Sequence, residues 1–66
     1  MHIIVNQQVQ HCDEHCSLQQ LITELGIEPN GLALAVNQQV IAKRLWPDYK
    51  LQPDDQVAAF QIVTGG

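Results

Sequence analysis

The stretch SLQQLITELG has the pattern of an amphipathic helix with a recognisable start and end, and it limits the fold more than any other segment. Ser17 and Gln20 fit a capping box, in which the side chain of each residue bonds the backbone N–H of the other. Gly26 follows at the position where a left-handed residue often ends a helix. The apolar side chains repeat at helical spacing: Leu18, Leu21, Ile22 and Leu25. We therefore predict a helix from about Ser17 to Leu25.

Most other apolar segments are short and rich in β-branched residues, which is typical of strands. They cover residues 2–6 (HIIVN), 9–12, 32–37 (LALAVN), 40–41 and 57–63, and we also expect a short edge strand at 49–51. Pro47 ends any helix that begins at residues 43–46, because a residue before proline is disfavoured in the helical conformation. Trp46, just before it, is expected to be partly buried by packing.

The pentapeptide VNQQV occurs twice, at residues 5–9 and 36–40, and both copies lie between apolar runs of the β type. Asn followed by polar residues is typical of turns, so each copy predicts a hairpin. Nothing else in the chain repeats, which favours coincidence over an internal duplication. A further turn is predicted at residues 52–55 (QPDD), with proline at its second position. We expect the side chains of Asp54 and Asp55 to be solvated there.

An early hairpin, one crossover helix and a late strand indicate a mixed sheet of about four to five strands with the main helix packed on one face. A right-handed crossover would place the last strand beside the first. This α+β arrangement is the β-grasp, or ubiquitin-like, architecture. We expect residues 1–62 to form a single β-grasp domain, and residues 63–66 to form a flexible C-terminal tail that ends in Gly-Gly.

Composition argues against several classes of function. The formal net charge is −4 and the basic residues are Lys43, Arg44 and Lys50, whereas a nucleic-acid binder would show a basic patch. No apolar run approaches the ~18 residues of a membrane span, the chain does not start like a secretion signal, and two cysteines make no disulfide framework. We therefore expect a cytoplasmic protein without nucleic-acid or membrane partners. A chain of this size has little room for a buried substrate cavity, which favours a binding module or carrier over a self-sufficient enzyme.

Thr64, Gly65 and Gly66 end the chain directly after the last predicted strand. Glycine has no side chain to pack and loses more conformational freedom on ordering than any other residue, so a terminal Gly-Gly adds little to the fold. It does suit a narrow channel, because glycine adopts backbone angles that other residues cannot. A C-terminal carboxylate is a poor electrophile that must first be activated, for example as an acyl-adenylate. The ending therefore indicates a reactive group that enters the active site of another protein.

Three segments carry a resemblance to a known family: GLALAVNQQVIAKRLW, DDQVAAFQIV and the terminal TGG. Together with the total length, they make the chain similar to the ThiS family of sulfur carriers of thiamine biosynthesis, whose fold is the β-grasp. The resemblance implies that Gly66 is adenylated by a ThiF-type adenylyltransferase and converted to a thiocarboxylate with sulfur from a donor protein. A ThiG-type thiazole synthase would then receive the sulfur for the thiazole ring.

By the same resemblance, ATP is consumed by the partner enzyme, and the catalytic residues lie in the partners. The chain would bind no cofactor and would act as a protein cosubstrate and not as an enzyme. Thr64 and Gly65 would belong to the tail, and Gly66 would carry the sulfur.

Side chains of the predicted last strand alternate between two faces. We place Val57 and Ala59 inward, toward the helix, and Ala58, Phe60 and Ile62 outward beside the tail. An exposed apolar patch marks an interface, and related carriers present a similar patch, so the three outward residues are the predicted partner-binding surface. The alternative is that Phe60 belongs to the core, as the only Phe of a small domain.

Four residues with metal-binding side chains occur within HCDEHC, at His11, Cys12, His15 and Cys16. Zinc favours Cys and His ligands, but structural sites usually draw on two separated pairs, and four ligands from six consecutive residues would need a tight wrap. We therefore predict no metal site. We interpret Cys12 as a half-buried small hydrophobe within an otherwise exposed His/Cys loop.

Three other functions fit parts of the sequence. The small subunit of molybdopterin synthase shares the fold, the tail and the activation chemistry, although those chains are usually longer. A ubiquitin-like modifier would use the tail as an acyl donor to lysines and not as a sulfur donor. A metal-binding module built on HCDEHC would depend on His11 or Cys16, whereas any carrier should lose its function when Gly66 is deleted.

Overall fold

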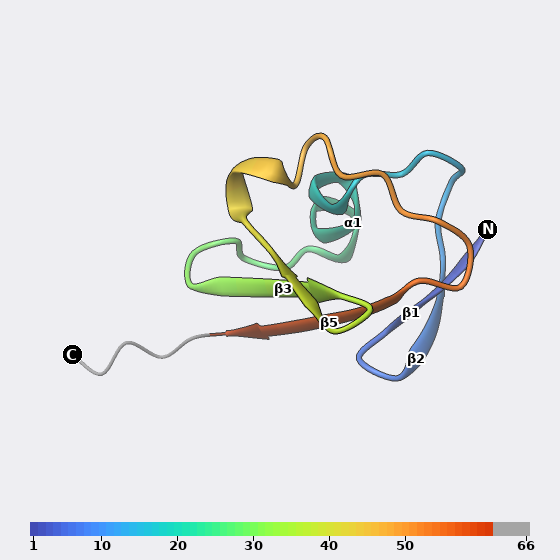
Figure 1. Cartoon of the computed structure of the whole chain (residues 1–66), viewed down its shortest axis with the longest axis horizontal. Helices are drawn as coiled ribbons and strands as arrows, with labels where there is room; N and C mark the ends of the chain where they lie inside the picture. The colour runs from blue at the N-terminus through green and yellow to red at the C-terminus, as the bar shows by residue number, and fades with distance from the viewer. Residues whose placement is uncertain (62–66) are drawn as a thin grey trace.

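Five strands, one α-helix and one turn of 3-10 helix make up the regular structure of residues 1–61, the part of the chain that the computed structural model describes (Figure 1). In chain order they are β1 (His2–Val5), β2 (Gln8–His11), α1 (Leu18–Leu25), β3 (Leu32–Val36), β4 (Gln39–Ile41), the 3-10 helix η1 (Lys43–Leu45) and β5 (Gln56–Gln61). The helix and the five strands begin and end within one residue of the predicted bounds, apart from the predicted end of the last strand, which lies outside the described residues.

The strands form one mixed sheet in the order β2-β1-β5-β3-β4. β5 lies in the middle, parallel to β1 and antiparallel to β3. The outer strands belong to the two predicted hairpins, β1–β2 and β3–β4. The last strand therefore lies beside the first, as the sequence predicted, and the arrangement is the β-grasp.

The helix α1 begins and ends as its sequence predicts. The Ser17 hydroxyl accepts a hydrogen bond from the Gln20 backbone N–H at 3.1 Å, and the Gln20 side chain accepts one from the Ser17 N–H at 3.0 Å. At the other end, Gly26 has a φ of 69°, in the left-handed region that glycine tolerates. The caps give partners to backbone groups that the helix itself cannot satisfy.

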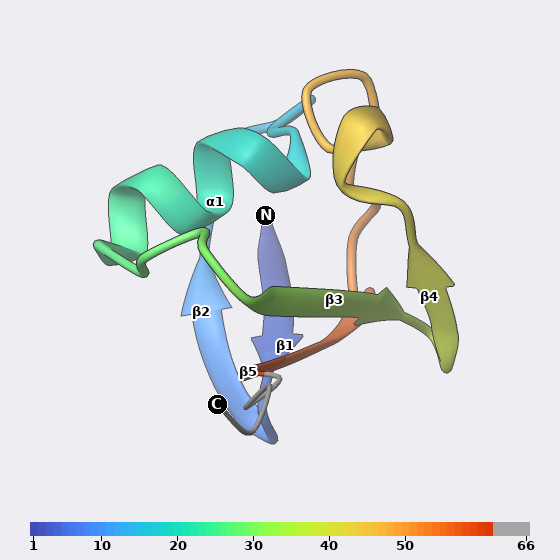
Figure 2. The same cartoon turned by 90° about the vertical axis from the view of Figure 1, so that its left-hand side faces the viewer.

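The apolar face of α1 packs on one side of the sheet, and Figure 2 shows the helix lying over that side. Leu18, Leu21 and Ile22 are buried, whereas Leu25, at the end of the apolar stripe, is 37% exposed. The sheet contributes inward side chains of β1, β3 and β5: Ile3, Val5, Leu32, Leu34, Val36 and Val57. Full burial of one such side chain contributes about 1.5–3 kcal/mol, so this single layer of contacts provides most of the driving force for folding.

Trp46 follows η1 and completes the core. Its side chain is only 1% exposed, and the indole Nε1 donates a hydrogen bond to the Ile41 carbonyl at 3.0 Å. A buried indole N–H needs such a partner. The predicted packing role of Trp46 is therefore confirmed, and its burial is more complete than expected.

Residues 49–51 are not the edge strand that the sequence predicted. The segment forms a single bridge, between Lys50 and Ser17. The Leu51 N–H also donates to the Cys16 carbonyl at 2.8 Å. The edge-strand prediction is wrong because the backbone groups of this segment pair with the chain just before α1, where they hold the start of the helix.

The prediction that Asp55 is solvated is wrong, because this residue is only 9% exposed. Its Oδ2 accepts a hydrogen bond from the Gln52 N–H at 2.8 Å, and its Oδ1 accepts one from Asn37 Nδ2 at 3.1 Å. A carboxylate can be buried when hydrogen bonds of this kind compensate for lost water. Asp54 beside it is exposed, as predicted, with a φ of 67° in the expected turn.

The predicted domain boundary after residue 62 and the predicted tail at 63–66 lie outside the part of the chain that the structure describes. The description of β5 ends at Gln61, which pairs with Leu32 of β3. Within residues 1–61, no helix is long and apolar enough to cross a membrane.

Candidate functional site

The face of β5 that points away from α1 carries exposed apolar side chains. Phe60 is 47% exposed and Ala58 is exposed, whereas Val57 is buried and Ala59 packs against the core. The predicted alternation is therefore confirmed for residues 57–60, and Phe60 does not belong to the core. Ile62, the third residue of the predicted patch, lies outside the described residues. The structure thus presents one large aromatic side chain to solvent, one residue before the described part of the chain ends.

The two VNQQV copies form hairpin turns of the same geometry. Asn6 and Gln7 have φ angles of 49° and 69°, and Asn37 and Gln38 have φ angles of 51° and 72°. Positive φ at both central residues is the mark of a type I′ turn, whose twist suits a two-residue hairpin. Asparagine tolerates this region better than most residues, which explains its place at the first central position of both turns.

The first turn also fastens β5. The Asn6 side chain accepts a hydrogen bond from the Ala59 N–H at 2.9 Å and donates one to the Ala59 carbonyl at 3.2 Å. A single carboxamide thus continues the pairing of β1 with β5 beyond the end of β1 at Val5. These two bonds hold the backbone of β5 one residue before Phe60, so the exposed ring projects from a fixed strand.

The second turn fastens the start of β5 in a related way. Asn37 Oδ1 accepts a hydrogen bond from the Gln56 N–H at 3.1 Å, while its Nδ2 donates to the buried carboxylate of Asp55. The Asn37 backbone N–H donates to the Gln56 carbonyl at 2.7 Å. The middle strand is therefore held from both sides by the same residue type in the same kind of turn.

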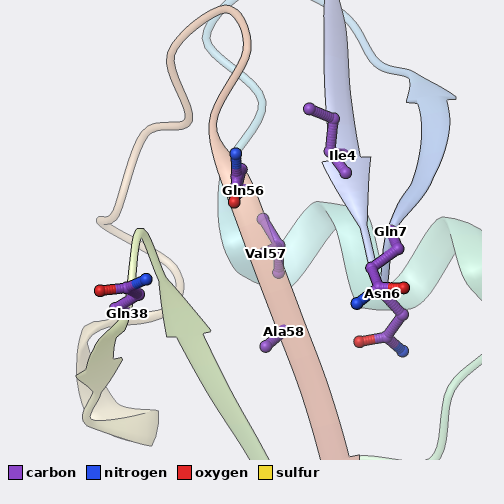
Figure 3. Close-up of a pocket in the computed structure, with 7 residues that line it drawn as sticks. All are labelled: Ile4, Asn6, Gln7, Gln38, Gln56, Val57 and Ala58. Atoms are coloured by element: carbon purple, nitrogen blue, oxygen red, sulfur yellow. The ribbon is translucent and has the colours of Figure 1, made fainter.

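A hollow of about 390 Å³ lies on this open face, between the two turns (Figure 3). The described residues that line it include no charged residue. They come from β1, β5 and both turns: Ile4, Asn6, Gln7, Gln38, Gln56, Val57 and Ala58. This hollow was not predicted from the sequence; three of its lining residues, Asn6, Gln7 and Gln38, belong to the repeated pentapeptide.

The HCDEHC segment differs from its predicted form. Cys12 and Cys16 are both buried, at 2% and 3% exposure, and both belong to the core, whereas His11 and His15 are exposed. The expectation of an exposed Cys16 is wrong because the segment turns back on itself, with the Cys16 N–H donating to the Asp13 carbonyl at 3.1 Å. No group of three or more His, Cys, Asp or Glu in residues 1–61 is arranged to hold a metal ion.

Burial also changes the chemistry of the two thiols. It raises the pKa of Cys16 to about 11 and raises the pKa of Cys12 above its usual value. The thiolate is the nucleophilic form of cysteine. Both thiols are therefore mainly protonated near neutral pH, and in this form they are poor nucleophiles. The tail residues Thr64, Gly65 and Gly66 lie outside the described residues.

Comparison with solved structures supports the fold. A crystal structure of the thiamine biosynthesis protein ThiS from Geobacter metallireducens has a TM-score of 0.88 at 19% identity, and the match covers 100% of both chains. An NMR structure of a thiamine biosynthesis protein from the same organism has a TM-score of 0.76 at 19% identity, over 100% of this chain and 88% of the other.

Comparison of sequences identifies the family. The sulfur carrier protein ThiS of Escherichia coli (strain K12) is 33% identical over 66 residues, which are 100% of both chains. The model of the ThiS family matches residues 3–66. The match includes the strands, the helix and the Gly-Gly ending, and the chain therefore belongs to the ThiS family.

Proposed function

We propose that this chain is a sulfur carrier of thiamine biosynthesis, and that the carboxylate of Gly66 is the group that carries the sulfur. The observation that carries the proposal is the family match, which extends to residue 66 and so includes the terminal Gly-Gly. The E. coli relative, named a sulfur carrier protein, aligns over its whole length as well. The two sequences align over the full length of both chains, so the terminal Gly-Gly of this chain lies within the match.

The proposed chemistry begins with activation of the carboxylate, because a free carboxylate does not accept a nucleophile. A carboxylate oxygen of Gly66 forms a bond to the α-phosphorus of ATP, and pyrophosphate leaves. A hydrosulfide ion then attacks the acyl carbon, AMP leaves with one of the carboxylate oxygens, and the proton of the hydrosulfide passes to water. The product is a thiocarboxylate, in which sulfur has replaced one oxygen of Gly66.

In our proposal, partner proteins provide the ATP site and the catalytic groups for these reactions. A ThiF-type adenylyltransferase would activate Gly66, a donor protein would supply the sulfur, and a ThiG-type thiazole synthase would receive it. The chain itself would serve as a cosubstrate and not as an enzyme. Its formal charge of −4 favours basic surfaces on these partners.

The described residues of β5 support a contact surface for the partners. Phe60 is the exposed aromatic residue of β5, and Ala58 lies on the same face. Aromatic side chains often supply much of the binding energy at protein interfaces. We propose that Ala58, Phe60 and Ile62 contact the partners, and that this contact positions Gly66 in each active site.

Intact-mass spectrometry tests the proposal. The full chain is incubated with ATP, a ThiF-type enzyme and sodium sulfide, and we expect a mass increase equal to the replacement of one oxygen by sulfur. A chain that lacks Gly66 should fold and show no increase. If an enzyme that thiocarboxylates the E. coli relative leaves this chain unchanged, the carrier proposal is wrong. Isopeptide adducts on lysines in place of the thiocarboxylate would instead support the ubiquitin-like modifier.

Phe60→Ala tests the contact surface separately. Because the Phe60 ring is about half exposed, the variant should fold, and we expect its rate of thiocarboxylate formation to fall by about tenfold or more, the effect of about 1.4 kcal/mol. Val9→Ala is the matched control, since Val9 is 69% exposed and lies on β2, away from Phe60. Equal rates for the two variants would show that Phe60 makes no contact of consequence.

A further inference from the structure

Two histidines face each other across the first hairpin. His2 of β1 and His11 of β2 are directly opposite in the antiparallel register, and both are exposed. The flanking residues Met1 and Cys12 exchange two hydrogen bonds, at 2.8 and 2.9 Å, through the terminal amine, the Cys12 N–H and the two carbonyls. The histidines therefore form the next, non-hydrogen-bonded pair of the ladder. Side chains at such a pair approach more closely than at a hydrogen-bonded pair.

The rings are already close to the spacing that a shared metal ion needs. Their centroids lie 5.6 Å apart, and their planes make an angle of 83°. Two imidazole nitrogens bound to one ion, at bond lengths of about 2.0–2.1 Å, place the ring centroids about 5 Å apart. Ile3, which follows His2 on β1, points into the core. Because side chains alternate along a strand, His2 and its partner His11 project from the open face. Both are exposed there, so their side chains can rotate slightly.

We propose that His2 and His11 form a surface site for one divalent transition-metal ion, which binds Cu(II) more tightly than Ni(II) or Zn(II). Imidazole suits all three ions, and the general order of divalent affinities places Cu(II) first. No third protein ligand joins the pair within residues 1–61, so water completes the coordination and the ion exchanges readily. The net charge of −4 favours the approach of a cation.

Four other groups nearby could in principle bind a metal ion, but the structure argues against each of them. The Met1 amine is already a hydrogen-bond donor to the Cys12 carbonyl. The Cys12 and Cys16 side chains lie in the core, at 2% and 3% exposure, and not on the open face. His15 is exposed but lies in the loop, at a φ of 64°, and has no opposed histidine in the β1–β2 register. The pair is therefore the site, and the HCDEHC cluster that the sequence draws attention to is not.

This inference is independent of the proposed function. In the parallel pairing of β1 with β5, Ile4 lies opposite Gln56, which is four residues before Phe60. His2 lies two residues earlier on β1, so the histidine pair and the partner-contact residues occupy opposite ends of the sheet face. Loss of metal binding would leave the carrier proposal untouched, and failure of the carrier proposal would leave the metal site untouched.

Calorimetric titration of the folded full chain with copper(II) chloride tests the site. We expect one ion to bind per chain, and His2→Asn and His11→Asn each to weaken binding by more than tenfold. Removal of a residue that only hydrogen-bonds to a metal ligand lowers metal affinity by about 10–100-fold. Removal of a ligand itself should lower the affinity at least as much. His15→Asn is the matched control. It should fold, because asparagine tolerates the positive φ at this position. It should bind copper as the parent does, because His15 is not part of the pair. Copper should also raise the midpoint of thermal unfolding of the parent and of His15→Asn, through preferential binding to the folded state.

Three results would overturn the proposal. Weakening by His2→Asn without weakening by His11→Asn would assign the ion to the Met1 amine and His2. Equal weakening by all three variants would indicate non-specific binding to histidine. Absence of binding by the parent chain, with its fold confirmed by circular dichroism, would show that the two rings do not act together.

Discussion

The two VNQQV copies have the same five residues and the same turn conformation, yet they meet different surroundings. Asn6 bonds the backbone N–H and carbonyl of Ala59, and both bonds are exposed. Asn37 bonds the Gln56 N–H and the carboxylate of Asp55, whose residue is only 9% exposed. Identical sequence thus determines the local conformation, whereas the energetic weight of each copy depends on the partner that the fold places beside it.

Asp55→Asn should give the largest loss of stability, because it removes the feature that distinguishes the second copy. The two Asp55 oxygens accept from Gln52 and Asn37, and an amide would place an NH2 group against one of these donors. We expect the free energy of unfolding to fall by about 1–3 kcal/mol, measured by urea denaturation. Asp54→Asn makes the same change of charge at the exposed neighbouring residue. Its free energy of unfolding should differ from that of the parent by no more than about 0.5 kcal/mol. A similar loss in both variants would attribute the effect to charge alone.

Replacing each turn asparagine with glycine compares the copies directly. Glycine adopts positive φ without strain, so the loss reports the side-chain hydrogen bonds. We expect Asn37→Gly to lower the free energy of unfolding by about 1–2 kcal/mol and Asn6→Gly by about 0.5–1 kcal/mol. The difference should arise from the buried partner of Asn37, and equal losses would contradict the comparison.

A double-mutant cycle sharpens this result. Asn37→Gly should lose part of its effect when Asp55→Asn is already present, because the two residues share a hydrogen bond. Asn6→Gly should add to Asp55→Asn within about 0.3–0.5 kcal/mol, as expected for groups without shared partners. Non-additivity of the same size in both cycles would mean that the turns are coupled through β5 and not through Asp55.

Replacing the glutamine in each turn should give small and nearly equal effects, opposite in sign to those of the asparagines. Gln7 and Gln38 have φ angles of 69° and 72°, and Asn-Gly is the preferred pair for a type I′ turn. We expect Gln7→Gly and Gln38→Gly each to stabilise the protein by about 0.5–1 kcal/mol, because relief of the left-handed strain exceeds the entropic cost of glycine. Thermal unfolding measures the gain. Gains that differ strongly between the copies would show that one glutamine makes a contact in solution that the turn geometry does not require.

The sequence predicted well the features that depend on neighbouring residues. The capping of α1 joins Ser17 and Gln20, three residues apart, and each hairpin turn is specified by its own Asn and Gln. The alternation of Val57 and Phe60 follows from the period of a strand. These interactions are formed within a few residues, so a local pattern is sufficient to predict them.

The features that the sequence did not predict depend on distant residues. Asp55 is buried because Asn37, 18 positions earlier, supplies a donor. Residues 49–51 pair with the chain before α1, at Ser17. His2 meets His11 only once the register of the first hairpin is known. A turn or strand pattern contains no information about such partners, which the assembled sheet provides.

The two protected thiols give this protein an internal probe of its own motions. A thiol reagent can reach Cys12 or Cys16 only when the segment between β2 and α1 opens, since both side chains lie in the core. The ratio of the labelling rate in the folded chain to that in an unfolded peptide therefore measures the free energy of local opening, on the principle used in hydrogen exchange. The same measurement, repeated with a partner protein added, would report whether the contact proposed at Phe60 makes the whole domain more rigid.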